Sequence, residues 1–245
     1  MYRFFEEADN LDGDTIKLSK ENTHHIVNVL RIREDEDFEV VIGDCVYLSN
    51  IYMGQNKLMV AKVKEIYGDK NESNLHIHLY QGLPKSDKLE FIIQKTIELG
   101  CFQITPFTSS RTIVKWDDNK AQKKLKRYEE IALAAAKQSK RGLVPKVNRP
   151  VSFSKLLDDI EGAFTLLAYE NGGKSLRNIL KEYKGREINI IIGPEGGFSQ
   201  EEVDQLEGKG AKVVHLGNRI LRTETAAVAL TAMVQYEIGD INEEI

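Results

Sequence analysis

The chain of 245 residues has few cysteines and no long apolar segment. Cys45 and Cys101 each lack a second thiol or histidine at the spacing of a metal site, so neither a disulfide framework nor a zinc site is expected. Buried, unreactive thiols are the simpler interpretation. No run of about 18 or more apolar residues occurs, and the N-terminus MYRFFEEADN lacks the basic-then-apolar order of a signal peptide. We therefore expect a soluble, cytoplasmic protein.

Four common catalytic or nucleotide-binding motifs are also missing. The sequence contains no GxGxxG after a strand, no Walker A sequence, no GxSxG elbow and no HExxH. The sequence therefore lacks the main evidence for four classes of protein: dinucleotide-binding proteins, P-loop NTPases, serine hydrolases and zinc proteases of the HExxH type. His76 and His78 can share one face of a strand, but no further ligand lies nearby in the sequence, so we expect structural histidines and no metal.

Positive charge is concentrated in the middle of an acidic chain. The formal net charge is -4, yet Pro84–Arg149 contains 15 Lys and Arg against 7 Asp and Glu. Local charge rather than total charge governs binding to phosphates, so this region can face a nucleic acid. The alternative is a solvated helix face rich in lysine, and composition alone does not separate the two.

The first 70 residues predict a small β-rich unit. Short alternating segments are separated by Gly, Asn and Asp turns; they are DTIKLS, DFEVVIG, CVYLSNIYM and KLMVAKVKEIY. One helix is expected over Glu21–Arg33, with Ile26, Val29 and Leu30 on its apolar stripe. The polar segment Tyr67–Ser73 marks a domain boundary, which divides the chain into residues 1–70 and 71–245.

The remaining residues alternate between strand and helix patterns, which predicts an α/β fold with a mostly parallel sheet. Strands are expected at LHIHLYQGL, ITPFTSSRTIV, TLLAY, INIIIG and KVVHLG. Helices are expected over Asp87–Leu99, ended by Gly100, over Lys120–Lys140, over Gln200–Gly208 behind a capping box of Ser199 and Glu202, and over about Thr223–Ile238. The last helix is apolar on most sides, which indicates burial in the fold or in a subunit interface.

The segment GPEGGF, Gly193–Phe198, follows an apolar strand and precedes a capped helix. Pro194 fixes the backbone, while Gly196 and Gly197 allow a close approach of main-chain groups to a ligand. Loops at strand ends are where open α/β sheets bind ligands. Glu195 adds a carboxylate that can accept from a ribose hydroxyl. A tight connection with an exposed glutamate is the alternative.

The segment LGNRILRTETAA, Leu216–Ala227, is a second loop that runs from a strand into a helix. Thr223 or Thr225 can cap that helix, and Glu224 is favoured near its positive end. Arg219 and Arg222 oppose the helix dipole and need an anionic partner, either a phosphate, a developing negative charge on a substrate or a carboxylate of the chain itself.

Together these motifs make the chain resemble the RsmE-type family of ribosomal RNA uridine-N3 methyltransferases in the SPOUT superfamily. The resemblance rests on PKSDKLEFIIQKTIELG, RYEEIALAAAKQSKR, LLAYE, IIGPEGGFSQEEV and LGNRILRTETAA, with RFF and THHIVNVLRIR in the first domain. It implies a small PUA-like β-barrel RNA-binding domain before a methyltransferase domain with a C-terminal trefoil knot. It also implies dimerisation through the knot region.

The resemblance implies S-adenosylmethionine as cofactor and a binding site on three loops. The cofactor-binding residues expected from it are Leu167, Ala168, Tyr169, Glu170, Ile192, Gly193, Glu195, Gly196, Leu216, Gly217, Ile220, Leu221, Arg222, Thr223, Thr225 and Ala226. The implied substrate is one uridine in the decoding region of 16S rRNA, methylated at N3 in the assembled 30S subunit.

The chemistry of that reaction agrees with the residues of the second loop. N3 of uracil is a weak acid that must lose its proton, which leaves negative charge on the ring oxygens. A fixed guanidinium stabilises such charge, so Arg222 is the first catalytic candidate, with Arg219 as a phosphate or carboxylate partner. Glu224 is the second catalytic candidate as general base; Glu195 or transfer of the proton to solvent are alternatives.

RNA is expected to follow a track of basic side chains. Besides Arg219, the candidates are Arg3, His25, Arg31, Lys85, Lys88, Arg111, Lys137, Lys140 and Arg141. REDED at Arg33–Asp37 lacks the glycine usual in the family, and PKVNRP at Pro145–Pro150 also differs. Both departures bear on RNA contacts rather than on the cofactor loops.

Two other functions compete with this interpretation. One is a non-catalytic RNA-binding protein, against which the intact GPEGG and LRTETA loops count. The other is a knotted methyltransferase that acts on the ribose or guanine of tRNA. The RFF opening and the β-rich first domain favour a ribosomal RNA substrate.

Overall fold

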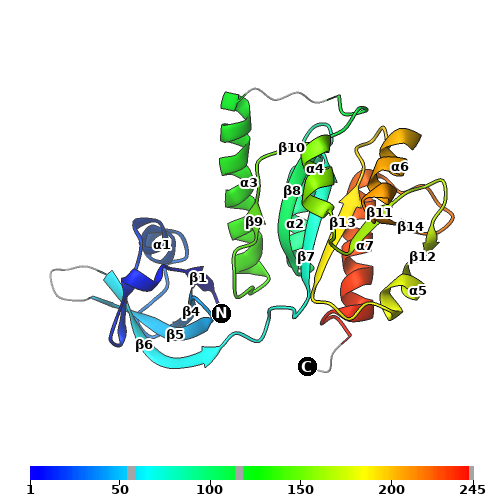
Figure 1. The fold of residues 1–245 in the computed structure, drawn as a ribbon. Helices are drawn as coiled ribbons and strands as arrows, with labels where there is room; N and C mark the ends of the chain where they lie inside the picture. Colours follow the sequence, from blue (N-terminus) through cyan, green and yellow to red (C-terminus); the bar gives the residue numbers. More distant parts are fainter. Residues whose placement is uncertain (54–58, 114–117, 243–245) are drawn as a thin grey trace. The chain divides into compact units, whose positions relative to one another are not determined.

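A computed structural model describes residues 1–53, 59–113 and 118–242, without the side chains of residues 118–120. The chain forms two compact units, which are described separately (Figure 1). The first contains Met1–Glu72 and Ala136–Val144, and the second contains Ser73–Ala135 and Pro145–Ile245. Within the described ranges, no helix has the length and apolar character needed to cross a membrane.

The first unit is built on a six-stranded sheet in the order β1-β4-β5-β6-β3-β2. Its elements are β1 (Arg3–Phe5), the 3-10 turn η1 (Ala8–Asn10), β2 (Leu11–Asp12), β3 (Thr15–Lys17), α1 (Lys20–His24), the π-helical turn η2 (His25–Val29), β4 (Asp37–Ile42), β5 (Cys45–Met53) and β6 (Met59–Gly68). β1 pairs with β4 in parallel and the other pairs are antiparallel. Apolar side chains alternate along the strands and meet in one core that includes Phe4, Ile16 and Phe38. The four expected strand segments are confirmed, except that Lys57 and Leu58 lie outside the described residues.

The helix expected over Glu21–Arg33 is shorter than predicted. Its α-helical part ends at His24, a π turn follows, and Arg31 has φ of 54°, which a helix cannot continue through. Because a π turn inserts one residue, Val29 leaves the apolar stripe and is 58% exposed, whereas Ile26 stays fully buried.

The second unit contains a parallel sheet in the order β10-β8-β7-β13-β11-β14-β12, with β9 also paired to β8. Its strands are β7 (His76–Gly82), β8 (Cys101–Thr108), β9 (Lys146–Val147), β10 (Val151–Ser152), β11 (Thr165–Ala168), β12 (Lys174–Ser175), β13 (Glu187–Ile192) and β14 (Lys212–His215). Every strand pair described in this sheet is parallel, which confirms the expected α/β class. Val114, at the end of the expected segment Ile104–Val114, lies outside the described residues.

Helices pack on both faces of this sheet (Figure 1). They are α2 (Lys88–Glu98), α3 (Asp118–Gln138, whose last three residues belong to the first unit), α4 (Phe153–Ile160), α5 (Leu176–Lys181), α6 (Gln200–Gly208) and α7 (Thr223–Ile238). On one face α7 packs on α2, β7 and β13. On the other, Leu156 of α4 and Leu206 of α6 join Phe107 and Leu167 in a second core.

Local signals in the sequence correctly predict the end of α2 and the start of α6, whereas α3 begins and ends two residues earlier than the expected Lys120–Lys140. Gly100 has φ of 86° directly after α2, and Ser199 and Glu202 form the predicted capping box at α6. α4 and α5 were not predicted from the sequence, because helices of 8 and 6 residues have too few turns to give a clear periodicity. Neither cysteine forms a disulfide in the described structure; Cys101 is buried and Cys45 is half-buried.

Candidate functional site

Three loops meet where parallel strands of the second unit end. They follow β11 at Tyr169, β13 at Gly193 and β14 at Leu216. β11 lies between β13 and β14, and all three strands run in the same direction, so their carboxyl ends share one edge of the sheet. This is the edge at which open α/β sheets bind ligands.

The loops enclose two adjoining cavities of ≈ 430 Å³ and ≈ 330 Å³. The first is lined by residues that include Lys88, Ala168, Glu170, Ile192, Gly193, Glu195, Gly196, Ile220, Leu221, Arg222, Thr223 and Ala226. The second is lined by residues that include Ala168, Tyr169, Glu170, His215, Leu216, Gly217, Arg219, Ile220, Leu221 and Ala226. Both linings contain Ala168, Glu170, Ile220, Leu221 and Ala226, so the two cavities adjoin each other. Residues from all three loops therefore line one joined space.

Most of the expected cofactor residues line these cavities, and two do not. Leu167 is fully buried in the second core and Thr225 is exposed outside both linings. Pro194, Gly197 and Phe198 of the same loop also line the first cavity, although the family resemblance did not indicate them as cofactor-binding residues. A Cβ at Gly193 would lie 3.0 Å from the Phe198 ring, so this glycine gives the aromatic side chain room to turn back under the loop.

The loop Gly193–Phe198 is held against neighbouring strand ends. Gly197 has φ of 64° and its N–H donates to the Pro194 carbonyl at 2.9 Å, which closes a tight turn. A Cβ at Gly82 would lie 2.4 Å from the Pro194 nitrogen, so only glycine at the end of β7 lets the loop lie so close. Arg111 donates through Nη1 to the Gly196 carbonyl at 3.0 Å. The loop is thus held by its own turn, by close packing against β7 and by the Arg111 side chain.

Lys88 joins two carboxylates at the cavity wall. Its Nζ lies 3.1 Å from Oε1 of Glu195 and 3.4 Å from Oε2 of Glu224. The hydrogen bond with Glu195 raises the pKa of Lys88. Burial acts to raise the pKa of Glu195, but backbone N–H donors, including that of Lys85, together with Lys88 lower it. Glu195 is therefore a charged and weakly basic carboxylate.

Glu224 has a different environment from Glu195. Its Oε2 is buried and has no hydrogen-bond partner among the residues that the structure describes, and Lys88 is its ion-pair partner. The Glu195 carboxylate, in contrast, accepts from the Lys85 N–H at 3.0 Å and pairs with Lys88 through the same oxygen.

The start of α7 differs from the sequence prediction. Neither Thr223 nor Thr225 is the capping residue, because Arg222 occupies the N-cap position and makes no side-chain cap hydrogen bond. The Thr223 hydroxyl instead donates to the Gly193 carbonyl at 2.7 Å. Thr223 is thus buried against the strand ends and ties α7 to the loop after β13.

Arg219 and Arg222 are both exposed at the cavities. Within residues 1–53, 59–113 and 118–242, no carboxylate forms an ion pair with either guanidinium. Ile220 lies between them and is 85% exposed although it is apolar. The anionic partner that two arginines need near a helix N-terminus is therefore not supplied by the described part of this chain.

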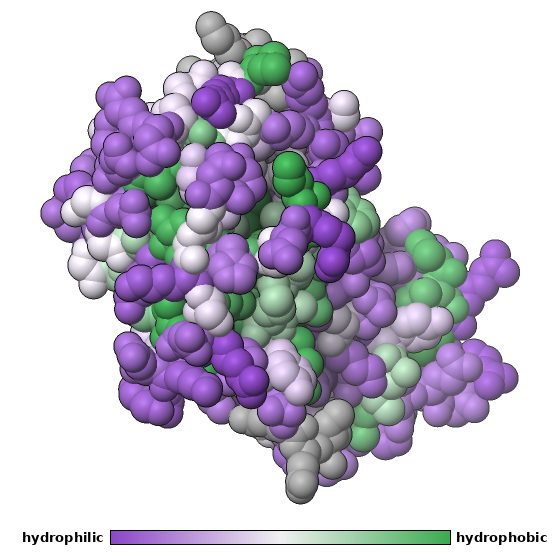
Figure 2. Space-filling view, turned by 90° about the vertical axis from the view of Figure 1, so that its right-hand side faces the viewer, coloured by the Kyte–Doolittle hydropathy of each residue, from purple (hydrophilic) through white to green (hydrophobic). Residues whose placement is uncertain are grey.

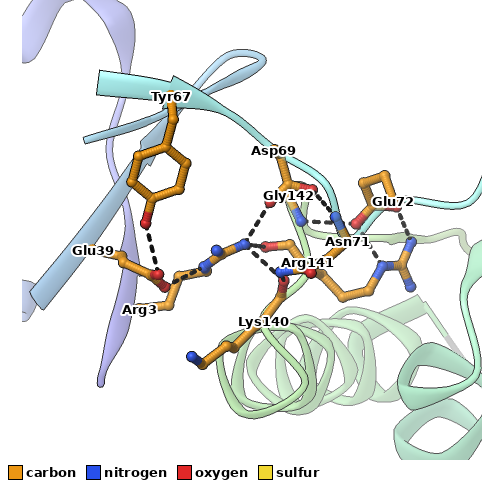
Figure 3. Close-up of polar contacts among 9 residues, drawn as sticks. All are labelled: Arg3, Glu39, Tyr67, Asp69, Asn71, Glu72, Lys140, Arg141 and Gly142. Atoms are coloured by element: carbon orange, nitrogen blue, oxygen red, sulfur yellow. Dashed lines mark hydrogen bonds and ion pairs between the residues drawn. The ribbon is translucent and has the colours of Figure 1, made fainter. Parts of the chain in front are cut away.

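Several basic residues expected to bind RNA are engaged inside the first unit (Figure 3). Arg3 is 4% exposed; Nε donates to Glu39 at 2.9 Å, and Nη1 donates to Asp69 and to the Lys140 carbonyl, both at 2.7 Å. Arg141 is 3% exposed and forms a bidentate pair with Glu72. The expectation that Arg3 and Arg141 contact RNA is wrong, because their guanidinium groups are buried and already paired.

Lys137 and His25 are also packed within the first unit. Lys137 donates to Oδ1 of Asn22 at 3.0 Å and its Nζ lies 5.1 Å from the Phe4 ring centre. Burial lowers the pKa of Lys137 and the pKa of His25, whose ring meets Phe4 edge-on. The side chains of Arg31, Lys85, Arg111 and Lys140 are exposed, so these four keep the accessibility that a phosphate contact requires.

No group of three or more potential metal ligands occurs among the described residues. His76 stacks on Phe102, whereas His78 is bonded to Oγ1 of Thr105 at 2.8 Å. The two histidines have separate structural contacts.

A hydrophilic surface with smaller hydrophobic patches covers the face shown in Figure 2.

Comparison with known proteins identifies the family. A family model described as RNA methyltransferase domain matches residues 71–235, and one described as RNA methyltransferase PUA domain matches residues 18–45. Ribosomal RNA small subunit methyltransferase E of Bacillus subtilis (strain 168) is 36% identical and is aligned over 97% of each chain.

Solved structures agree with the sequence relatives. A ribosomal RNA small subunit methyltransferase E from Neisseria gonorrhoeae, bound to S-adenosyl methionine, is 33% identical with a TM-score of 0.88 over 98% of this chain and 99% of that one. A structure from Legionella pneumophila in complex with the bound cofactor SAM is 30% identical with a TM-score of 0.86 over 98% of both chains. The relatives named here match this chain along nearly their whole length, and the loops of its parallel sheet enclose the cavities. This chain therefore belongs to the ribosomal RNA small subunit methyltransferase E family.

Proposed function

We propose that the joined cavities bind S-adenosylmethionine. Backbone groups of Gly193, Gly196 and Leu216 offer hydrogen-bond donors and acceptors, and Ile220 and Leu221 offer apolar surface for an adenine ring. Carboxylates of Glu170 and Glu195 suit ribose hydroxyls or a cationic group. When bound, the cofactor supplies a methyl group activated by the neighbouring sulfonium.

The proposed acceptor is N3 of one uridine in the decoding region of 16S rRNA, within the assembled 30S subunit. Removal of the N3 proton leaves negative charge on the ring oxygens of uracil. The observation that carries the proposal is that Arg222 lines the cavity, is exposed and has no ion-pair partner in the described chain. Its guanidinium is free to stabilise that charge as it develops.

Glu224 is the proposed general base. Its Oε2 lies 3.4 Å from Lys88 Nζ and accepts no hydrogen bond from the residues that the structure describes, whereas the lowered pKa of Glu195 makes that carboxylate a poor proton acceptor. Lys88 holds the two carboxylates at the cavity wall, so its proposed role is electrostatic rather than direct contact with RNA. The methyl transfer then needs the acceptor nitrogen in line with the donor, which is a matter of positioning.

RNA contacts are proposed for the exposed basic residues of each unit. Lys85, Arg111 and Arg219 lie near the cavity loops, and Arg31 and Lys140 are exposed on the first unit. Each exposed Lys or Arg can neutralise one phosphate. The first unit is then an RNA-binding domain of the PUA type, in agreement with the family model that matches within it.

We also propose that the chain forms a trefoil knot, that it dimerises through the knot region and that it is located in the cytoplasm. A Cβ at Gly173 would lie 2.8 Å from the Val214 backbone, so the loop after β11 passes directly against β14. α6 and α7, on either side of β14 in the chain, pack on opposite faces of the sheet. Exposed Tyr236 and Ile241 near the C-terminus supply apolar surface for a second copy.

The test is methyl transfer from labelled S-adenosylmethionine to three substrates: small ribosomal subunits that lack the modification, free 16S rRNA and bulk tRNA. The expected result is label at one uridine N3 in the small subunits. Label on tRNA ribose or guanine would support the competing methyltransferase function. Cofactor binding without transfer to any of the three RNAs would contradict the proposed substrate.

A further inference from the structure

A buried glutamine lies directly behind the cofactor loops. Gln81 is near the end of β7 and is 0% exposed. Its Nε2 donates to Oγ1 of Thr223 at 2.9 Å and to the Gly82 carbonyl at 2.9 Å. Gln81 lines neither cavity, so it has no direct contact with a ligand placed there.

Two successive hydrogen bonds connect Gln81 through the Thr223 hydroxyl to the loop after β13. Because the Thr223 hydroxyl donates its one proton to the Gly193 carbonyl at 2.7 Å, it must accept from Gln81. The relay therefore joins the end of β7, the start of α7 and the first residue of the Gly193–Phe198 loop. Gly193 lines the first cavity, and Thr223 directly follows Arg222, the proposed catalytic arginine.

The other end of the Gln81 amide is unsatisfied. Oε1 of Gln81 is buried without a hydrogen-bond partner among the described residues. A buried acceptor with no partner lowers stability, and an apolar side chain of the same length would avoid that loss. Stability alone therefore does not explain an amide at this position.

A second buried glutamine in the same unit provides the contrast. Gln235 of α7 is also 0% exposed, but both ends of its amide are bonded, with Oε1 accepting from Ser73 at 2.9 Å and Nε2 donating to the Gly100 carbonyl at 3.3 Å. It lines neither cavity. Gln235 has the contacts of a structural residue, while Gln81 has those of a residue that orients another side chain.

We propose that Gln81 is a positioning residue that, through the Thr223 hydroxyl, fixes the Gly193 carbonyl and the start of α7 in the geometry that binds the cofactor and aims Arg222. The inference rests on the proposed function, because it assumes that the cavity binds S-adenosylmethionine. If these hydrogen bonds are lost, the loop that begins at Gly193 and the start of α7 can both move, and both line the first cavity. Small displacements of this kind reduce both binding and transfer without unfolding the domain.

The experiment measures the dissociation constant for S-adenosylmethionine by calorimetry, the melting temperature and the transfer rate. Variants are Gln81→Met, Thr223→Val, their combination, Thr223→Ser and the control Gln235→Met. Gln81→Met keeps the side-chain length and removes both the donor and the unsatisfied oxygen. We expect it to weaken cofactor binding about tenfold while the melting temperature stays the same or rises.

The other variants distinguish positioning from structure. Thr223→Val should match Gln81→Met, the combination should be no worse than either single change, and Thr223→Ser should retain binding because it keeps the hydroxyl. Gln235→Met should lower the melting temperature but leave cofactor affinity unchanged. The proposal is overturned if Gln81→Met binds the cofactor normally, or if its affinity falls only together with its melting temperature.

Measuring cofactor binding and methyl transfer to RNA on the wild-type protein also distinguishes a failure of this inference from a failure of the proposed function. If the wild-type protein binds S-adenosylmethionine but modifies no RNA, the proposed substrate fails while the binding data still decide the role of Gln81. If the wild-type protein does not bind the cofactor at all, both proposals are contradicted.

Discussion

Arg3 and Arg141 of the first unit and the two arginines at the cavities of the second unit lie in opposite environments. Arg3 and Arg141 are almost fully buried and paired with carboxylates, whereas Arg219 and Arg222 are exposed and lack an ion pair in the described chain. From the sequence, all four are candidates for binding RNA or its reactive base. The difference teaches that carboxylates distant in sequence decide whether an arginine is structural or available to a ligand.

The largest expected effect is on the stability of the first unit. Arg3→Ala leaves Glu39 and Asp69 buried without their partner, so the free energy of unfolding should fall by about 3–5 kcal/mol. The matched control is Arg33→Ala, since Arg33 also contacts two carboxylates but its side chain is 72% exposed. Denaturant titration should show a change within about 0.5 kcal/mol for that control. Equal effects for both variants would contradict the structural role of Arg3.

Half-buried His78 gives the second unit a predicted loss of stability in acid. Burial lowers the pKa of His78 to about 4 from 6.5 in the unfolded chain. Protons therefore bind the unfolded state preferentially, so stability is full above pH 6.5 and falls by roughly 3 kcal/mol at most as the pH decreases to about 4. His78→Gln should remove this contribution to the pH dependence, whereas His76→Gln, at an exposed position, should not. Thermal unfolding at each pH measures both.

The two carboxylates beside Lys88 should differ in their catalytic effect. Glu224→Gln removes the proposed base, so kcat should fall about 100-fold at saturating cofactor. Glu195→Gln removes a carboxylate that is already committed to backbone donors and Lys88, and should reduce kcat less than about tenfold. Similar small losses in both variants would indicate that the N3 proton passes to solvent.

Arg219 should have the smallest effect, limited to RNA binding. Arg219→Ala removes one exposed guanidinium, so KM for RNA should rise while kcat stays constant, and the salt dependence of log K should become shallower by about 1. Arg177→Ala is the control, because Arg177 is exposed on α5 and lines neither cavity. A fall in kcat for Arg219→Ala would instead assign it to the chemical step.

Features that depend on neighbouring residues were predictable from the sequence. The stop of α2 at Gly100, the capping box at α6 and the loops after β13 and β14 each follow from residue types within a short segment. The loop after β11 was expected as part of the site only from the family resemblance. The parallel sheet then brings these loops to one edge. This is why most of the expected cofactor residues line the same cavities.

Features that depend on distant partners were not predictable. Arg3 meets Lys140 across 137 positions of the sequence, and Gln81 meets Thr223 across 142. The π turn at His25–Val29, whose Ile26 packs in the core, likewise follows no pattern in the local sequence. Residue type gave the correct chemistry for each side chain, but the folded chain determined which partner it met.

The central claim is that Arg222 acts on the reacting base and contributes little to the fold. Its most direct test is single-turnover methyl transfer to small ribosomal subunits by Arg222→Ala at saturating S-adenosylmethionine, with melting temperature and cofactor affinity measured alongside. We predict a rate lower by about 100- to 1000-fold, with an unchanged melting temperature and cofactor affinity within about threefold of the wild type. A transfer rate close to that of the wild-type protein, or a loss explained by unfolding or by weaker cofactor binding, would contradict the claim.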